Sequence, residues 1–100
     1  MEEKIFGGYC TKQDLKNKGF IGITVMILRA TIVLHGRLDL KFKSMNKELM
    51  DDPKNKIIPK EEIAKLLEAC GVTEASKLRG KIVLGYPNFD GGLKCIGVKC

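Results

Sequence analysis

The chain has no tryptophan and only six aromatic residues among its 100. A core with so few large rings must be built mainly from Ile, Leu and Val side chains. The hydrophobic content of 44% and the charged content of 30% are ordinary for a soluble globular protein. Residues 1–100 are therefore expected to form a single domain around one modest aliphatic core.

Long apolar runs are also missing. The longest apolar stretch covers residues 20–34, and Gly22, Thr24 and Arg29 interrupt it. A helix needs about 20 apolar residues to cross a bilayer, so this stretch predicts no membrane span. The charged start of the chain, Met1–Lys4, lacks the apolar segment of a signal peptide, which favours a cytoplasmic location.

The sequence contains no recognisable catalytic motif. It has no nucleophile–base pair, paired carboxylates, zinc motif or phosphate-binding loop with the spacing that such sites need. His35 is the only histidine, and no carboxylate or nucleophile stands at a recognisable spacing from it. We therefore expect a protein that is not an enzyme, needs no cofactor and binds no metal.

The four cysteines are Cys10, Cys70, Cys95 and Cys100. A reducing cytoplasm keeps cysteines as thiols, so we expect no disulfide framework here. Cys70 and Cys95 have apolar neighbours in their predicted elements. Both are expected to be buried as small hydrophobic residues.

The clearest predicted element is a helix over residues 60–70. Its apolar residues recur at i, i+3, i+4 and i+7, which places them on one face: Ile63, Leu66, Leu67 and Cys70. Pro59 suits the first position of a helix, and Gly71 suits the left-handed turn that ends one. This helix is expected to pack its apolar face against a sheet.

Two central strands follow from alternation and from β-branched residues. Residues 37–43 alternate between charged and apolar side chains, which places Phe42 on the core side of a strand. Residues 22–34 are rich in Ile, Val and Thr, which favours a buried strand, bent or broken near Arg29-Ala30, over a buried helix. Periodicity alone does not separate these two alternatives.

Weaker signals complete the predicted sheet. They indicate strands over residues 4–10, 81–86 and 93–99, a short helix over 12–18 and a turn-rich loop over 87–92. Gly7-Gly8 indicates a bulge within the first of these strands. The predicted fold class is α+β: a small antiparallel sheet of about four to five strands packed by one main helix, residues 60–70.

The polar stretch over residues 44–58 shows no periodicity and is expected to be a long loop. A loop of this length in a small domain is uncommon and often functional, although an inert insertion is the equal alternative. Charged residues around this loop form a candidate contact surface, to which the 87–92 loop adds one aromatic residue. The candidate binding residues are Lys41, Lys43, Lys47, Asp51, Asp52, Lys54, Lys56 and Phe89.

The second half of the chain resembles a family of small phage-encoded proteins of unknown function. The similar string is IAKLLEACGVTEASKLRGKIVLGYPNFDGGLKCIGV, residues 63–98, and Phe6–Tyr9 adds a shorter likeness. The matching positions are Leu67, Gly71, Val72, Leu78, Gly80, Lys81, Ile96 and Gly97. Residues 20–58 have no counterpart in that family. The resemblance implies a phage or prophage accessory protein in the host cytoplasm, with no catalytic residues to transfer.

Three functions follow as expectations. The first is a non-catalytic binding protein, a monomer or homodimer, that docks on and inhibits a host defence protein such as a CRISPR effector. The second is single-stranded nucleic-acid binding by an OB-like module, since the formal net charge is +6. The third is capture of a small nucleotide by an oligomer, with amides of Gly7-Gly8 or Gly91-Gly92 around the phosphates. We favour the first, because base stacking needs exposed aromatic residues and glycine pairs are more often turns.

Overall fold

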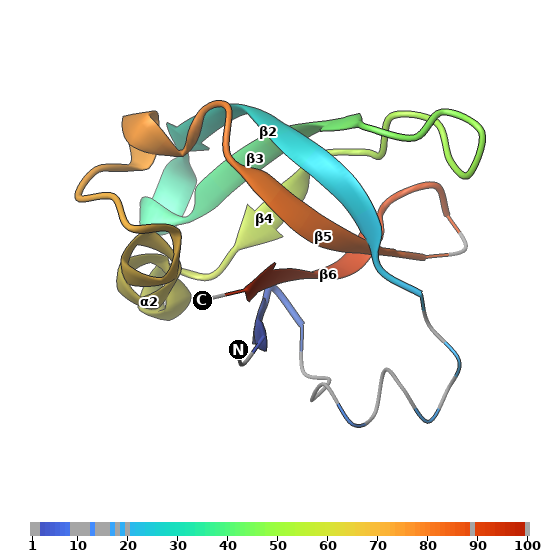
Figure 1. The fold of residues 1–100 in the computed structure, drawn as a ribbon. Helices are drawn as coiled ribbons and strands as arrows, with labels where there is room; N and C mark the ends of the chain where they lie inside the picture. The colour runs from blue at the N-terminus through green and yellow to red at the C-terminus, as the bar shows by residue number, and fades with distance from the viewer. Residues whose placement is uncertain are drawn as a thin grey trace.

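The computed structural model describes residues 3–8, 13, 17, 19, 21–88 and 90–99. Its elements are, in chain order, β1 (Glu3–Phe6), β2 (Ile23–Ile32), the 3₁₀ turn η1 (Leu34–Gly36), β3 (Leu38–Ser44), β4 (Lys56–Ile58), α2 (Lys60–Cys70), the 3₁₀ turn η2 (Ala75–Leu78), β5 (Ile82–Pro87) and β6 (Leu93–Lys99). The predicted α+β class with an antiparallel sheet is confirmed (Figure 1). The predicted strand number is wrong, because the described residues form six strands instead of four to five.

All strands belong to one sheet in the order β1-β6-β5-β2-β3-β4, and each neighbouring pair is antiparallel. The sheet curls so strongly that its first and last strands approach each other. A Cβ atom added at Gly7, just after β1, would lie 2.7 Å from Lys56 Cε and 3.0 Å from Ile58 Cδ1 of β4. The Lys56 ammonium also donates a hydrogen bond of 3.0 Å to the carbonyl oxygen of Lys94 in β6. These contacts fasten the curled sheet into a nearly closed barrel.

The additional strand is β4, which lies inside the stretch predicted as a loop. The irregular part is therefore shorter than residues 44–58 and covers residues 45–55. Three residues are too few to show a period of two, so β4 carries no clear sequence signal. Ile58 is fully buried nonetheless, because its register with β3 points it into the barrel.

The β-branched stretch forms the strand β2, and the alternative of a buried helix is excluded. The pairing of β2 with β3 shifts register between Ile27 and Arg29, so Leu28 is the extra residue of a β-bulge. The bend predicted near Arg29 is confirmed by this bulge. Val25 and Ile27 are fully buried, and regular alternation would bury Arg29 as well. The bulge instead reverses the phase and places Arg29 on the outer side of the sheet.

The main core fills the inside of the curled sheet. Its buried side chains are mostly aliphatic, as expected for a chain without Trp: Phe6, Val25, Ile27, Leu38, Leu40, Phe42, Ile58, Leu66, Leu78, Val83, Leu93, Ile96 and Val98. Every second residue of β3 is buried, so the alternation predicted for residues 37–43 is confirmed. The outer positions of β3 are left for charged side chains.

Helix α2 covers one end of the barrel, where it contacts β1, β6 and η2. Leu66 is fully buried, and the other residues of the predicted apolar face are partly buried against the same core. Gly71 has the left-handed φ of 72°, and its N–H donates a 3.1 Å hydrogen bond to the Glu68 carbonyl oxygen, as a helix stop requires. Pro59 is the N-cap instead of the first helical residue, because its carbonyl oxygen accepts the Glu62 N–H at 3.0 Å.

The remaining predictions differ from the structure mainly at strand ends. β1 ends at Phe6, because Gly7 turns the chain with a φ of 78°, and residues 9 and 10 lie outside the described residues. The helix predicted over residues 12–18 also lies outside the continuous described segments. β5 and β6 match their predicted ranges within one residue.

Candidate binding face

The outer side of the barrel carries a group of residues on four neighbouring strands, and all of them except the buried Gly97 are exposed or half-buried. We call this group the binding face: Thr24, Met26, Arg29, Lys41, Lys43, Ile82, Leu84 and Gly97. Strand register makes them neighbours, since Met26 pairs with Lys43 on one side and with Ile82 on the other. The strands that carry the centre of this face, β2 and β5, run across the front of Figure 1.

Three basic side chains form one edge of the binding face, and we call them the basic row. Arg29 of β2 lies directly opposite Lys41 of β3, and Lys43 is the next outward residue of β3. Like charges directly opposite each other in a sheet destabilise it. The one ion pair within the described residues joins Lys47 and Asp52, so none of the three basic side chains is neutralised by an ion pair there. The basic row therefore presents a positive charge that folding alone does not explain.

A carboxylate does follow Lys41 on the outer side of β3. Asp39 is half-buried and pairs with Thr31, one outward position beyond Lys41. Its Oδ2 atom accepts a 3.4 Å hydrogen bond from the Asn55 amide, and its buried Oδ1 atom has no hydrogen-bond partner within the described residues. Asp39 therefore limits the positive charge at the Lys41 end of the basic row. At the other end the pKa of Asp52, lowered first of all by its partner Lys47, is lowered further by the charge of Lys43, which forms no ion pair with it.

The centre of the binding face is a hollow of about 240 Å³ lined by Thr24, Ile82, Val83, Leu84 and Gly97. Aliphatic side chains make its walls, and Ile82 keeps 52% of its surface exposed at the rim. Gly97 contributes only backbone to the lining, and the Glu3 carboxylate occupies the place where a Cβ atom of residue 97 would lie. The hollow lies close to the basic row. Only one residue, Met26, lies between Ile82 at the rim of the hollow and Lys43 across the sheet.

A buried carboxylate–phenol pair lies beside the hollow. The Tyr86 hydroxyl of β5 donates a 2.5 Å hydrogen bond to Glu3 Oε1 of β1, reaching across β6. A Cβ atom at Gly97 would collide with this carboxylate, whose Cδ atom would lie only 2.8 Å away. Burial, followed by the hydrogen bond and the charge of Glu3, raises the pKa of Tyr86 well above its ordinary value near 10.

The raised pKa of Tyr86 predicts a loss of stability at alkaline pH. Above pH 10 the unfolded chain releases the phenol proton while the folded chain keeps it, so the free energy of unfolding falls as the pH rises. The slope for this one group approaches about 1.4 kcal/mol per pH unit. Denaturant unfolding from pH 8 to 11 should show a steeper loss in the wild type than in Tyr86→Phe. Parallel losses in the two proteins would contradict the assignment.

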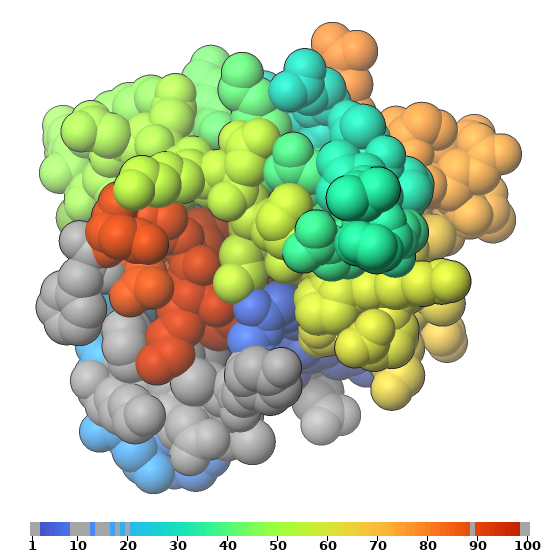
Figure 2. Space-filling model, turned by 180° about the vertical axis from the view of Figure 1, so that it is seen from behind, coloured from blue at the N-terminus to red at the C-terminus, as the bar shows by residue number. Residues whose placement is uncertain are grey.

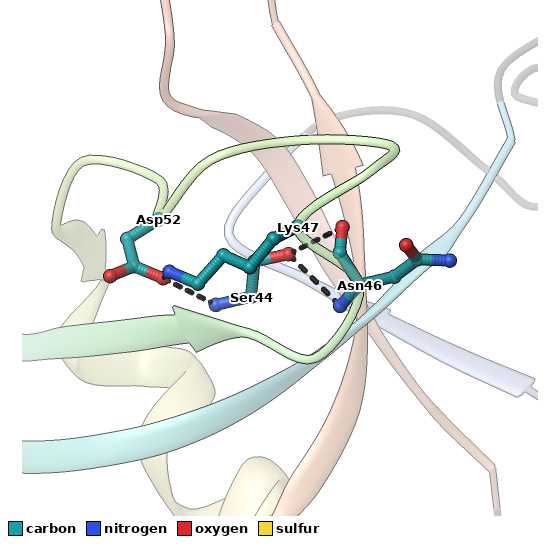
Figure 3. A network of polar contacts seen from close by, with 4 residues as sticks. All are labelled: Ser44, Asn46, Lys47 and Asp52. Atoms are coloured by element: carbon teal, nitrogen blue, oxygen red, sulfur yellow. Dashed lines mark hydrogen bonds and ion pairs between the residues drawn. The ribbon is translucent and has the colours of Figure 1, made fainter.

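The polar loop predicted as the contact surface forms a compact network of its own (Figure 3). Asp52 accepts a 2.9 Å hydrogen bond from the Ser44 N–H and pairs with the Lys47 ammonium. These two donors, the lysine first, lower the pKa of Asp52 below its ordinary value. The Ser44 hydroxyl donates to the Asn46 carbonyl oxygen at 3.1 Å, and Asn46 starts a helical turn by accepting the Leu49 N–H. Two charged residues of the loop, Lys47 and Asp52, therefore bind each other and the loop backbone.

The structure separates the predicted binding residues into groups. Lys41 and Lys43 belong to the basic row, Lys47 and Asp52 pair within the loop, and Asp51 and Lys54 are exposed. Lys56 points inward from β4, and its ammonium donates to the Lys94 carbonyl oxygen. Phe89 lies outside the described residues. Figure 2 shows the 45–55 loop beside the β5–β6 loop, where the Lys54 N–H donates to the Gly91 carbonyl oxygen at 3.1 Å.

The glycine pairs considered for phosphate binding lie next to carboxylates. A small hollow of about 100 Å³ at Gly7 and Gly8 is also lined by Glu61 and Glu62, and the Gly7 N–H donates to Glu62 Oε1 at 3.3 Å. In the other pair, the Gly92 N–H donates to Asp90 Oδ1 at 2.9 Å. Negative side chains already occupy these amides and would repel a phosphate. This arrangement argues against nucleotide capture at either place.

The sequence did not reveal the hollow or the role of Arg29. Arg29 stands out as the single charge within a β-branched stretch, but its direction depends on the bulge at Leu28. Gly97 and Ile82 become neighbours through the pairing of β5 with β6 and with β2, which local patterns do not specify. The outward position of Lys41 and Lys43 was predictable from alternation alone.

Other candidate groups contribute little to a site. Cys95 is fully buried, as predicted, and Cys70 is partly buried against the core. His35 is exposed in the turn η1. Among the described residues, no three His, Cys, Asp or Glu side chains gather as they would around a metal ion. No described helix has the length and apolar content required to cross a bilayer.

Comparison of the chain with protein-family models, with curated proteins and with solved structures gave no match.

Proposed function

We propose that this chain is a non-catalytic binding protein that docks on an acidic surface of another protein through its binding face. The observation that carries the proposal is the basic row, Arg29, Lys41 and Lys43, which is exposed and free of ion pairs within the described residues. Complementary charge speeds encounter and selects the partner, while adjacent apolar surface supplies affinity. The hollow beside the basic row offers that apolar surface.

A protein partner fits this face better than single-stranded nucleic acid does. Single-strand platforms stack bases on exposed aromatic rings. The aromatic residues of the described part are Phe6, Phe42 and Tyr86, and each is at most 6% exposed. The side chain between the basic row and the hollow is that of Met26, a half-buried, unbranched apolar residue that suits contact with a peptide or protein surface.

The resemblance to phage-encoded accessory proteins indicates which partners to test first. Such a protein would act in the host cytoplasm, as a monomer or homodimer, by covering an acidic surface on a host defence protein. A CRISPR effector is one such candidate. Inhibition by simple coverage needs no catalytic residues and no cofactor, which agrees with the lack of catalytic motifs in the sequence.

Recovery of partners from nuclease-treated host lysate tests the proposal. The wild type is compared with the triple variant Arg29→Glu, Lys41→Glu, Lys43→Glu. A control variant, Lys60→Glu, Lys65→Glu, Lys77→Glu, changes the net charge equally but alters exposed residues of α2 and η2. We expect the wild type and the control to retain a stoichiometric protein partner. The face variant should lose at least about tenfold in affinity for it.

Three results would contradict the proposed function. They are equal retention of the partner by the face variant, recovery of no stoichiometric partner by the wild type, and tight binding of a single-stranded oligonucleotide. The last is measured by fluorescence anisotropy, in which phosphate contacts would make the affinity fall steeply with salt concentration.

A further inference from the structure

We infer that the hollow holds one apolar side chain of an extended, acidic segment of the partner, while the basic row binds carboxylates of the same segment. This inference rests on the proposed function and specifies the chemistry of its ligand. It follows from three properties of the binding face: the size of the hollow, its distance from the basic row, and the sign of the charge beside it.

The size of the hollow fits a side chain better than a whole small molecule. Pockets for cofactors and drug-sized ligands usually enclose about 300–1,000 Å³. The hollow measures about 240 Å³ and is lined by aliphatic walls, the Thr24 side chain and the bare backbone of Gly97. None of its lining residues is charged, and the Glu3 carboxylate that lies against Gly97 accepts the hydrogen bond of the Tyr86 hydroxyl. A branched aliphatic side chain is the occupant that such a surface can desolvate and retain.

The distance to the basic row sets the spacing within the ligand. Ile82 on the wall of the hollow lies on β5 and pairs with Met26 of β2, which pairs with Lys43 of β3, so Ile82 and Lys43 lie directly across two strands from each other. Neighbouring strands are about 4.8 Å apart, so the separation is about 10 Å. An extended chain advances about 3.3–3.6 Å per residue, and alternate side chains point the same way. Carboxylates two to four residues from the apolar anchor would therefore meet the basic row.

The charge excludes a second copy of this chain as the occupant. In a two-fold symmetric contact the same patch of each subunit meets its copy. The basic row of one subunit would then lie against the positively charged binding face of the other. The chain also carries a formal net charge of +6, which opposes its association with itself. An acidic segment of a different protein is complementary both to the positive binding face and to the positive net charge of the chain.

Labelled peptides test this inference directly. The probe is an unstructured Gly/Ser peptide with one Leu and with Glu at two and four positions on either side of it. Two comparison peptides replace the Leu by Gly or every Glu by Gln. In fluorescence anisotropy at low salt, we expect the Leu peptide to bind about tenfold more tightly than the Gly peptide. The Gln peptide should not bind measurably.

Two variants of exposed threonines on β2 connect the Leu preference to the hollow. Thr24→Phe fills the hollow, whereas Thr31→Phe places the same ring on the same side of the same strand, outside it. Thr24→Phe should bind the Leu and Gly peptides equally, and Thr31→Phe should keep the preference. If Thr24→Phe does not fold, Ile82→Gln removes the exposed wall and should reduce the preference. The circular dichroism spectrum and melting temperature report folding of each variant.

The outcomes separate the two proposals. Equal binding of the Leu and Gly peptides to the wild type, or a preference unchanged in Thr24→Phe, overturns the role of the hollow but leaves an acidic partner in place. Binding of the Leu peptide that survives Arg29→Gln, Lys41→Gln, Lys43→Gln overturns the proposed function instead. Absence of binding by any peptide overturns this inference.

Discussion

Replacement of Leu66 by alanine is expected to lower the free energy of unfolding by about 2–5 kcal/mol, the range for truncation of a fully buried leucine. Leu66 has no exposed surface and is the buried residue of α2. It joins a helix to the core of a barrel whose strands cannot close that end themselves. The surrounding sheet is held by strand pairing and cannot collapse into the space left behind, which places the loss in the upper part of the range.

Leu67 provides the matched control for this prediction. It is the same residue type on the same helix, but it is only partly buried against the core. Leu67→Ala should therefore cost clearly less than Leu66→Ala in denaturant unfolding, with helix propensity changed equally in both variants. An unchanged melting temperature in Leu66→Ala would mean that the helix face does not pack on the sheet and serves as an interface instead.

The sequence predicted those parts of the fold in which one residue pattern has one structural meaning. The apolar spacing over residues 60–70, followed by Gly71, specifies a helix and its end without any tertiary information. The alternation over residues 37–43 specifies which side of β3 is buried. In both cases the pattern extends over enough residues to establish its period.

The parts that the sequence did not predict depend on contacts between distant segments. β4 has three residues, and only its pairing with β3 makes it a strand. The direction of Arg29 depends on a bulge, because one extra residue reverses every side chain that follows. The hollow requires three strands in a fixed register. The candidate residues that alternation identified, Lys41 and Lys43, were therefore placed correctly, whereas their partners on β2 and β5 were not found.

The loop prediction shows why charge alone identifies binding residues poorly. Lys47 and Asp52 lie in the most polar stretch of the chain, but the structure pairs them with each other around the Ser44 backbone. Lys56 uses its ammonium to hold the barrel closed. Charged groups that already bind each other or the backbone are less available to bind a partner protein. The unpaired basic row on the sheet is more informative than the larger number of charges in the loop.

Replacement of Gly97 by alanine is expected to cost about 2–4 kcal/mol, because the new Cβ atom would occupy the place of the Glu3 carboxylate. Displacing that group breaks its hydrogen bond with Tyr86 and leaves two buried polar groups without their partner. An unsatisfied buried group costs about 1–3 kcal/mol, and more when it is charged. Denaturant unfolding measures the loss.

Gly85→Ala is the matched control, because Gly85 is also paired within the sheet but meets only side-chain methyl groups. Its added Cβ atom would lie 2.9 Å from Cδ2 of the buried Leu93, so the cost of Gly85→Ala comes from crowding of apolar side chains and not from a broken polar contact. A double-mutant cycle then isolates the cause. In Glu3→Ala the carboxylate is absent, so adding Gly97→Ala should cost much less than it does in the wild type, with a coupling energy of about 1–3 kcal/mol. Additive losses would show that the alanine at position 97 disturbs the strand itself and that the space above Gly97 is not reserved for Glu3.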